Sequence, residues 1–131
     1  MNLRQVKARI EMAIFRFRSR CQRFHRGWAY ADVWNMDDWF VRTVRPMLIH
    51  LRDNHWGVPV EFADNPDKWD VILTEMIYCL EMMDEDKVYD AMYGDDWTGS
   101  LEEWRAVYAE VDRNKDRFFA QFSKYFYNLW D

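Results

Sequence analysis

The sequence predicts a single all-α domain over residues 1–131, a compact bundle of four main helices with a long ordered loop between the second and the third. Three observations lead to this fold class. Apolar residues recur at steps of three and four over long stretches, as they do on one face of a helix. Only 4 glycines and 3 prolines interrupt the chain. Aromatic residues make up 18% of it, enough for a large core and for an apolar surplus that favours a homo-oligomer.

The segment WDVILTEMIYCLE, residues 69–81, is the predicted centre of the fold. At 100° per residue, its apolar side chains cover most of the circumference and leave a narrow polar strip, so we expect this helix inside the domain. Asn65 as N-cap and Pro66 as first helical residue should start it. Glu75 lies among apolar neighbours, and should therefore reach solvent or meet a cation or hydrogen-bond donors.

The first helix is predicted from Leu3 to Arg26, with Gly27 as its C-terminal cap. Residues 1–30 carry eight basic side chains and one acidic one, a net charge of +7 against −12 for the other 101 residues. These basic side chains could bind anions or pack on acidic neighbours of the same molecule. We expect the apolar seam to face the core, although a basic amphipathic helix can also lie on a membrane or on nucleic acid. The seam consists of Val6, Ile10, Ile14, Phe17, Cys21 and Phe24.

A second helix should begin after Asn35, its expected N-cap, and Pro46 should kink its interior or free the carbonyl near Arg42. Asp37 falls in the middle of its apolar face, whereas Asp38 can pair with an arginine on the outside. That apolar face consists of Phe40, Val41, Val44, Met47, Leu48 and Leu51.

The pattern stops between residues 53 and 66, which predicts the long loop. His55, Trp56 and Phe62 are its side chains that could touch a ligand. The alternative is that the two aromatic rings plug the loop onto the core.

The rest of the chain predicts a short helix from Lys87 to Met92 and a last helix that runs to the C-terminus. Ser100 and Glu103 form the capping box that should start this last helix. Its inward-facing residues are expected to be Trp104, Val107, Val111, Phe118, Phe122, Tyr125, Phe126 and Leu129.

Two cysteines, Cys21 and Cys79, both lie in apolar helical patterns, so free buried thiols in a reducing cytoplasm are expected rather than a disulfide. No apolar run is long enough for a membrane span, and the first residues lack the pattern of a secretion signal. We therefore expect a cytoplasmic protein without a membrane partner.

Several catalytic signatures are absent from the sequence: a glycine-rich phosphate loop, Cys-x-x-Cys and His-Glu-x-x-His. Asp112, Asn114 and Asp116 imitate the start of a calcium loop, but Arg117 and Ser123 stand where glycine and glutamate are required. We expect no cofactor, and the sequence does not identify a metal.

Carboxylates at Asp67, Asp70, Glu81 and Asp84 leave one enzymatic alternative open. All-α nucleotide pyrophosphohydrolases hold magnesium with Glu-x-x-Glu and Glu-x-x-Asp pairs on neighbouring helices. Glu81 and Asp84 have the form of the second pair, but no Glu-x-x-Glu precedes them. Acidic pairs at this spacing are also common on solvated helix faces.

A binding site without chemistry is the other possibility, because aromatic rings stack on bases and arginines bind phosphates. The alternative is that Asp37 and Glu75 pair with arginines of the first helix and fix the helix order. The candidate ligand-binding residues are Arg23, Arg26, Trp28, Asp37, His55, Trp56, Glu75 and Trp130.

Three segments, RGWAYADVWNMDDWF, WDVILTEMIYCLE and FAQFSKYFYNLWD, resemble a widespread group of small, mostly uncharacterised proteins encoded by tailed bacteriophages. The chain departs from the group at Met36, where leucine is usual, and at Thr74, where aspartate is usual. The positions that match are Arg26, Gly27, Asp37, Gly57, Pro59, Trp69, Glu75, Met76, Ile77, Glu81, Lys124, Tyr125, Leu129, Trp130 and Asp131.

This resemblance implies a phage factor acting in the host cytoplasm, with an ordered C-terminal end and no catalytic residues to carry over. The sequence thus leads to a non-enzymatic accessory or counter-defence protein that sequesters a nucleotide-type molecule or blocks a host protein. A nucleotide site should show a pocket with arginine and aromatic side chains. A protein blocker should show an exposed aromatic patch, and a magnesium hydrolase should bring carboxylates from two helices together.

Overall fold

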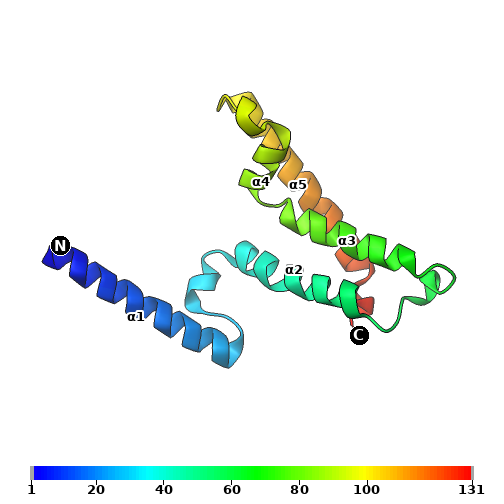
Figure 1. Cartoon of the computed structure of the whole chain (residues 1–131), viewed down its shortest axis with the longest axis horizontal. Helices are drawn as coiled ribbons and strands as arrows, with labels where there is room; N and C mark the ends of the chain where they lie inside the picture. The colour runs from blue at the N-terminus through cyan, green and yellow to red at the C-terminus, as the bar shows by residue number, and fades with distance from the viewer. Residues whose placement is uncertain (1, 131) are drawn as a thin grey trace. The chain divides into compact units, whose positions relative to one another are not determined.

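The computed structural model describes residues 2–130, and every regular element among them is helical (Figure 1). This confirms the all-α class. Five α-helices are described, and one of them is the short helix predicted from Lys87, which begins at Glu85. The α-helices are α1 (Leu3–Arg26), α2 (Met36–Asn54), α3 (Asp67–Glu81), α4 (Glu85–Met92) and α5 (Leu101–Lys124). The 3-10 helices are η1 (Tyr30–Val33), η2 (Val60–Phe62), η3 (Gly94–Asp96) and η4 (Phe126–Asn128).

The chain divides into two compact units, one ending at Phe40 and one beginning at Val41. The N-terminal unit contains α1, η1 and the first residues of α2. Asn2 starts α1 with a capping box, and Gly27 ends it in the left-handed conformation at φ 77°, which glycine adopts without strain. The predicted bounds of α1 are therefore confirmed, and the backbone turns at Gly27 into η1.

The apolar seam of α1 is largely exposed, in contrast to the predicted core-facing role. Ile10 is 55% exposed, Phe17 68% and Phe24 88%. Ser19, on another side of the helix, is the one buried residue of α1. Cys21 is exposed as well, so its predicted burial is wrong. Periodicity showed that one face is apolar, but it could not show what covers that face.

In the second unit α3 packs against α5, and α4 packs against the first part of α5. The central position of α3 is confirmed, since Trp69 stacks on Phe62 at 6.1 Å and meets Tyr125 edge-on at 5.3 Å between ring centroids. Three apolar residues expected to face inward are exposed: Met47 and Val71 are each 64% exposed, and Phe126 is 54% exposed. The fully buried core includes Trp69, Leu73, Met76, Leu80, Val88, Val107 and Phe118.

The segment that imitates a calcium loop is an ordinary part of α5, and its Asn114 is buried. The Asn114 amide donates hydrogen bonds to the carbonyl oxygens of Met82, at 3.3 Å, and Glu110, at 3.0 Å. A buried amide needs such partners. Asn114 therefore ties the end of α3 to α5.

The capping box of Ser100 and Glu103 starts α5 as predicted. The helix ends at Lys124, short of the predicted C-terminal end, and η4 follows. The Trp130 indole then donates a hydrogen bond to the Tyr127 carbonyl at 2.9 Å. Asp131, the last residue of the phage-like motif, lies outside the described residues.

Two expectations concern α2 and the segment after it. The helix begins at Met36, directly after the expected cap, and continues through Pro46. Residues 55–66, between α2 and α3, contain η2. Among the described residues, no helix combines the length and the apolar character needed to cross a bilayer.

Candidate functional site

Three of the predicted ligand-binding residues, Arg23, Arg26 and Trp28, lie together at the turn that follows α1. Arg23 makes a two-point ion pair with Asp32 of η1, with distances of 2.6 Å from Nη2 to Oδ1 and 3.0 Å from Nε to Oδ2. The Asp32 carboxylate is buried and also accepts the Ala29 backbone N–H at 2.8 Å. This pairing raises the pKa of Arg23, chiefly through the hydrogen bond to Asp32. Arg23 therefore fastens the turn.

Arg26 is also engaged within the turn. Its guanidinium carbon lies 3.9 Å from the ring centroid of Trp28 and 4.3 Å from that of Tyr30. Its Nε donates a hydrogen bond to the Trp28 carbonyl at 3.1 Å. Cation–π contacts of this kind stabilise a local structure. The three predicted residues therefore lie together, but their contacts serve to hold η1 on α1.

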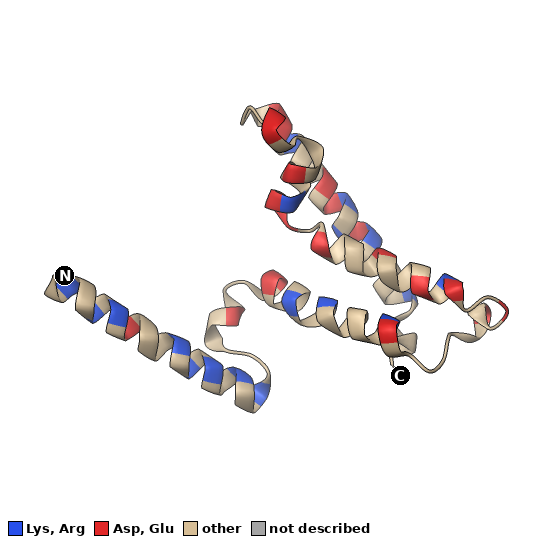
Figure 2. Cartoon of the chain, viewed as in Figure 1, with Lys and Arg blue, Asp and Glu red and all other residues tan. Residues whose placement is uncertain are grey.

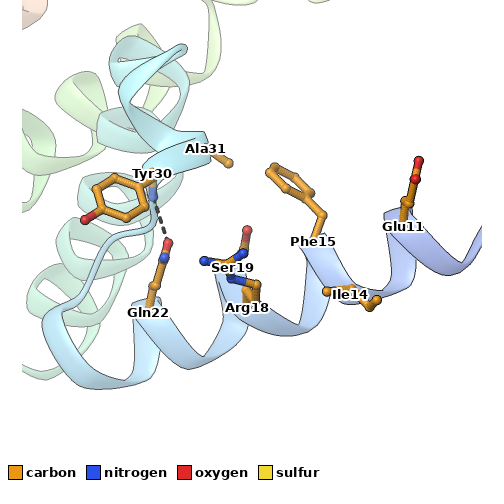
Figure 3. Close-up of a pocket in the computed structure, with 8 residues that line it drawn as sticks. All are labelled: Glu11, Ile14, Phe15, Arg18, Ser19, Gln22, Tyr30 and Ala31. Atoms are coloured by element: carbon orange, nitrogen blue, oxygen red, sulfur yellow. Dashed lines mark hydrogen bonds between the residues drawn. The ribbon is translucent and has the colours of Figure 1, made fainter. Parts of the chain in front are cut away.

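A pocket of about 350 Å³ lies beside this turn, between α1 and η1 (Figure 3). Phe15 of α1 points toward Ala31 of η1, and the Tyr30 backbone N–H donates to Gln22 Oε1 at 3.0 Å. Arg18 and Glu11 bring opposite charges to the wall. The volume is at the lower end for small-molecule sites. The pocket has the arginine and aromatic groups expected of a nucleotide site, supplied by residues that the sequence did not single out.

The exposed seam of α1 lies on a different side of the helix from this pocket. At 100° per residue, Ile10 and Phe17 lie close together on one side, whereas Met12 and Ser19 lie on the opposite side. Ser19 lines the pocket, so η1 packs away from most of the seam. Ile14, at the edge of the seam, is the member that the pocket wall includes. The α1 seam, defined as Val6, Ile10, Ile14, Phe17, Cys21 and Phe24, is therefore a separate surface.

Lysine and arginine residues recur along the length of α1 (Figure 2). The 100° spacing places Lys7 and Arg18 along one edge and Arg9, Arg16 and Arg20 along the other. Glu11 is the one acidic residue of the helix. An apolar stripe between two basic rows can recognise a partner that is apolar and negatively charged.

The carboxylate of Glu75 has partners on α5 in the second unit. It pairs with Arg117 and accepts a hydrogen bond from Gln121 Nε2 at 2.7 Å. These contacts, first that of Gln121 and then that of Arg117, lower the pKa of Glu75. The interpretation that Glu75 pairs with an arginine of the first helix is wrong. Asp37 lies on the apolar side of α2 by its helical position, but it is exposed on the first turn, so the expected burial of its carboxylate is wrong.

The carboxylates that favoured a magnesium site serve other contacts. Glu81 pairs with Arg45 at 2.7 Å and Lys87 at 2.9 Å, and these contacts lower its pKa, Lys87 more than Arg45. Asp84 caps α4 by accepting the Asp86 N–H at 2.9 Å. The residues that the structure describes contain no group of three or more histidine, cysteine, aspartate or glutamate side chains placed to hold a metal.

The other candidate residues of the second unit do not form a recognisable site. His55 Nε2 lies 2.7 Å from Asp70 Oδ1, with the His55 side chain 15% exposed. Phe62 packs on Trp69, as the core-plug interpretation expects, whereas Trp56 is 94% exposed. Trp130 is 73% exposed. Sequence reasoning missed Asp32, Arg117 and Gln121 as partners, since long-range pairs leave no periodic signal.

Comparison of the chain with protein-family models, with curated proteins and with solved structures gives no match.

Proposed function

We propose that this protein is a phage-encoded accessory or counter-defence factor that acts by binding, without catalysis, and that the α1 seam is its docking surface. The observation that carries this proposal is the exposure of an apolar helix face between two basic rows. Burying one large apolar side chain stabilises a complex by roughly 1.5–3 kcal/mol. Ile10, Ile14, Phe17 and Phe24 are each more than half exposed, and together they can anchor a partner.

An exposed aromatic patch favours a blocker of a larger host component over a sponge for nucleotides. Phe17 and Phe24 supply that patch. Arg23 and Arg26, the arginines expected to hold a phosphate, are engaged by Asp32 and by two aromatic rings.

Matched aspartate substitutions on α1 test the docking surface. Ile10 and Met12 are similarly exposed, at 55% and 51%, but they lie on opposite sides of the helix. Ile10→Asp should abolish binding to host components recovered with the tagged protein from infected cells, whereas Met12→Asp should preserve it. Circular dichroism checks that both variants keep their helices. Equal recovery of host components with the two variants would show that the α1 seam is not the docking surface.

The pocket beside η1 supports nucleotide sequestration as a second candidate, since it combines Arg18, Phe15 and Tyr30. A thermal-shift screen of mono-, di- and cyclic oligonucleotides, with and without magnesium, tests it. A ligand at about 100 times its dissociation constant adds about 2.7 kcal/mol to the free energy of unfolding. The shift should disappear in Arg18→Ala, and the ligand should be recovered intact. A degraded ligand would instead favour the magnesium-dependent hydrolase.

A further inference from the structure

We infer that the partner of the α1 seam is an anionic membrane surface, on which α1 lies flat with the seam in the lipid and its basic rows at the phosphates. This inference rests on the proposed docking role of α1 and names the chemistry of its partner. It replaces the expectation of a protein without a membrane partner, which followed from the lack of a membrane-spanning run and of a secretion signal in the sequence.

The shape of the seam fits a plane. It extends from Val6 to Phe24, which is about 27 Å at the rise of an α-helix, and its members remain on one side over this length. Five of its six residues are exposed. An apolar stripe along one side of a helix matches the interfacial layer of a bilayer, which needs no complementary pocket.

The charge pattern distinguishes a bilayer from a second copy of α1. Both edges of the seam are basic, so two α1 seams packed together would bring arginines against arginines in either direction. A groove in a protein would need acidic residues along both rims for the full length of the helix. A bilayer with anionic lipids presents negative charge on both sides of the helix wherever it lands.

The fold of the N-terminal unit leaves this surface available. The ion pair between Arg23 and Asp32 holds η1 against α1. The pocket between α1 and η1 is lined by Ser19, which lies on the opposite side of α1 from Phe17. The helix can therefore meet a membrane without any rearrangement of the turn. The rest of the chain has a net charge of −12 and is repelled by anionic lipid, so contact through α1 should be reversible and weakened by salt.

Vesicle co-sedimentation of the full chain tests this inference. The probes are vesicles of equimolar phosphatidylcholine and phosphatidylglycerol, and vesicles of phosphatidylcholine alone. We expect binding to the anionic vesicles, little binding to the neutral ones, and release by salt. Each basic residue near the surface should contribute about fivefold to affinity, so Arg20→Gln should bind about fivefold more weakly.

The matched pair on α1 shows whether the seam enters the lipid. Ile10→Asp should lose at least tenfold in affinity for anionic vesicles, whereas Met12→Asp should lose much less. Equal losses in the two variants, or unchanged binding in Ile10→Asp, would overturn the inference. Absence of vesicle binding by the wild-type chain would overturn it as well.

Cys21 provides an independent reporter because it is a member of the seam and is exposed, while Cys79 is buried. Anionic vesicles should slow the reaction of Cys21 with a water-soluble maleimide at least tenfold, and neutral vesicles should not. Binding without protection of Cys21 would place another surface on the lipid and overturn the inference. Protection that rises with protein concentration and needs no vesicles would overturn it in favour of a second copy covering the seam.

The two proposals can fail separately. If the protein does not bind vesicles but Ile10→Asp still abolishes the recovery of host components, the membrane inference is wrong and the docking role of α1 stands. If Ile10→Asp changes neither the binding of vesicles nor the recovery of host components, both proposals are wrong.

Discussion

Arg23 and Asp32 form a two-point ion pair that closes the turn between α1 and η1. The Asp32 side chain is 5% exposed and also accepts the Ala29 N–H, whereas the Arg23 side chain is 40% exposed. Asp32 is therefore the residue of this pair whose substitution leaves buried hydrogen-bonding groups without partners. Substituting Arg23 to test ligand binding would disturb the turn itself, so Arg20 or Arg18 is the better position for such tests.

Asp32→Asn should open this turn. Loss of the charge weakens a buried interaction by about 1–3 kcal/mol, which corresponds to about 5- to 150-fold faster local opening. Hydrogen exchange of the Ala29 amide measures this rate. Asp37→Asn, at an exposed position on α2, should leave it unchanged. Equal exchange in wild type and Asp32→Asn would contradict the structural role of the pair.

Two neighbouring positions on α3 should differ sharply in their contribution to stability. Leu73 is fully buried and Val71 is 64% exposed. Leu73→Ala should lower the free energy of unfolding by about 2–5 kcal/mol through lost apolar burial and a cavity. Val71→Ala should change it by about 0.5 kcal/mol or less. Urea unfolding followed by circular dichroism provides both values, and similar losses would mean that α3 is not oriented as described.

The sequence was sufficient for helix positions wherever the signal is local. Gly27 marks the end of α1, and Ser100 with Glu103 marks the start of α5, because caps depend on residues three or four positions apart. The apolar pattern of residues 69–81 also predicted an enclosed helix, since a helix apolar on most sides must be surrounded, and α3 contributes buried residues to the core of the second unit.

The site was less predictable because it depends on partners far away in the chain. Glu75 was recognised as out of place, but no local rule could select Arg117 and Gln121 among the available donors. The same holds for the α1 seam, since periodicity identifies an apolar face without saying what covers it. The exposure of Asp37 has a related reason: its wheel position is on the apolar face, but that face is not buried at the first turn of α2.

Acid should weaken the second unit through Glu75 and Glu81. Hydrogen bonds and ion pairs lower the pKa of both carboxyls below the usual 4.5. Because the unfolded chain binds these protons at higher pH, the stabilisation is complete above about pH 4.5 and is lost as the pH falls through the folded-state pKa values. Urea midpoints measured across this range should drop.

The variant Glu75→Gln isolates one of these groups. It should be less stable than wild type at neutral pH and should show a smaller loss on acidification, since the titrating carboxyl is gone. Glu61→Gln, at an exposed position on η2, serves as the control and should keep the wild-type slope. An unchanged slope in Glu75→Gln would show that Arg117 and Gln121 do not stabilise the charged form.

The two cysteines should separate cleanly by reactivity. Cys21 is exposed on α1, whereas Cys79 is buried on α3, and burial raises the pKa of its thiol. Since the thiolate is the reactive form, a colorimetric thiol reagent should modify one group quickly in the native protein and the second only as the second unit unfolds. Cys21→Ser should remove the fast phase and leave the slow one. Two fast phases in the native protein would mean that α3 is not enclosed, and would contradict the core built around Trp69 and Leu73.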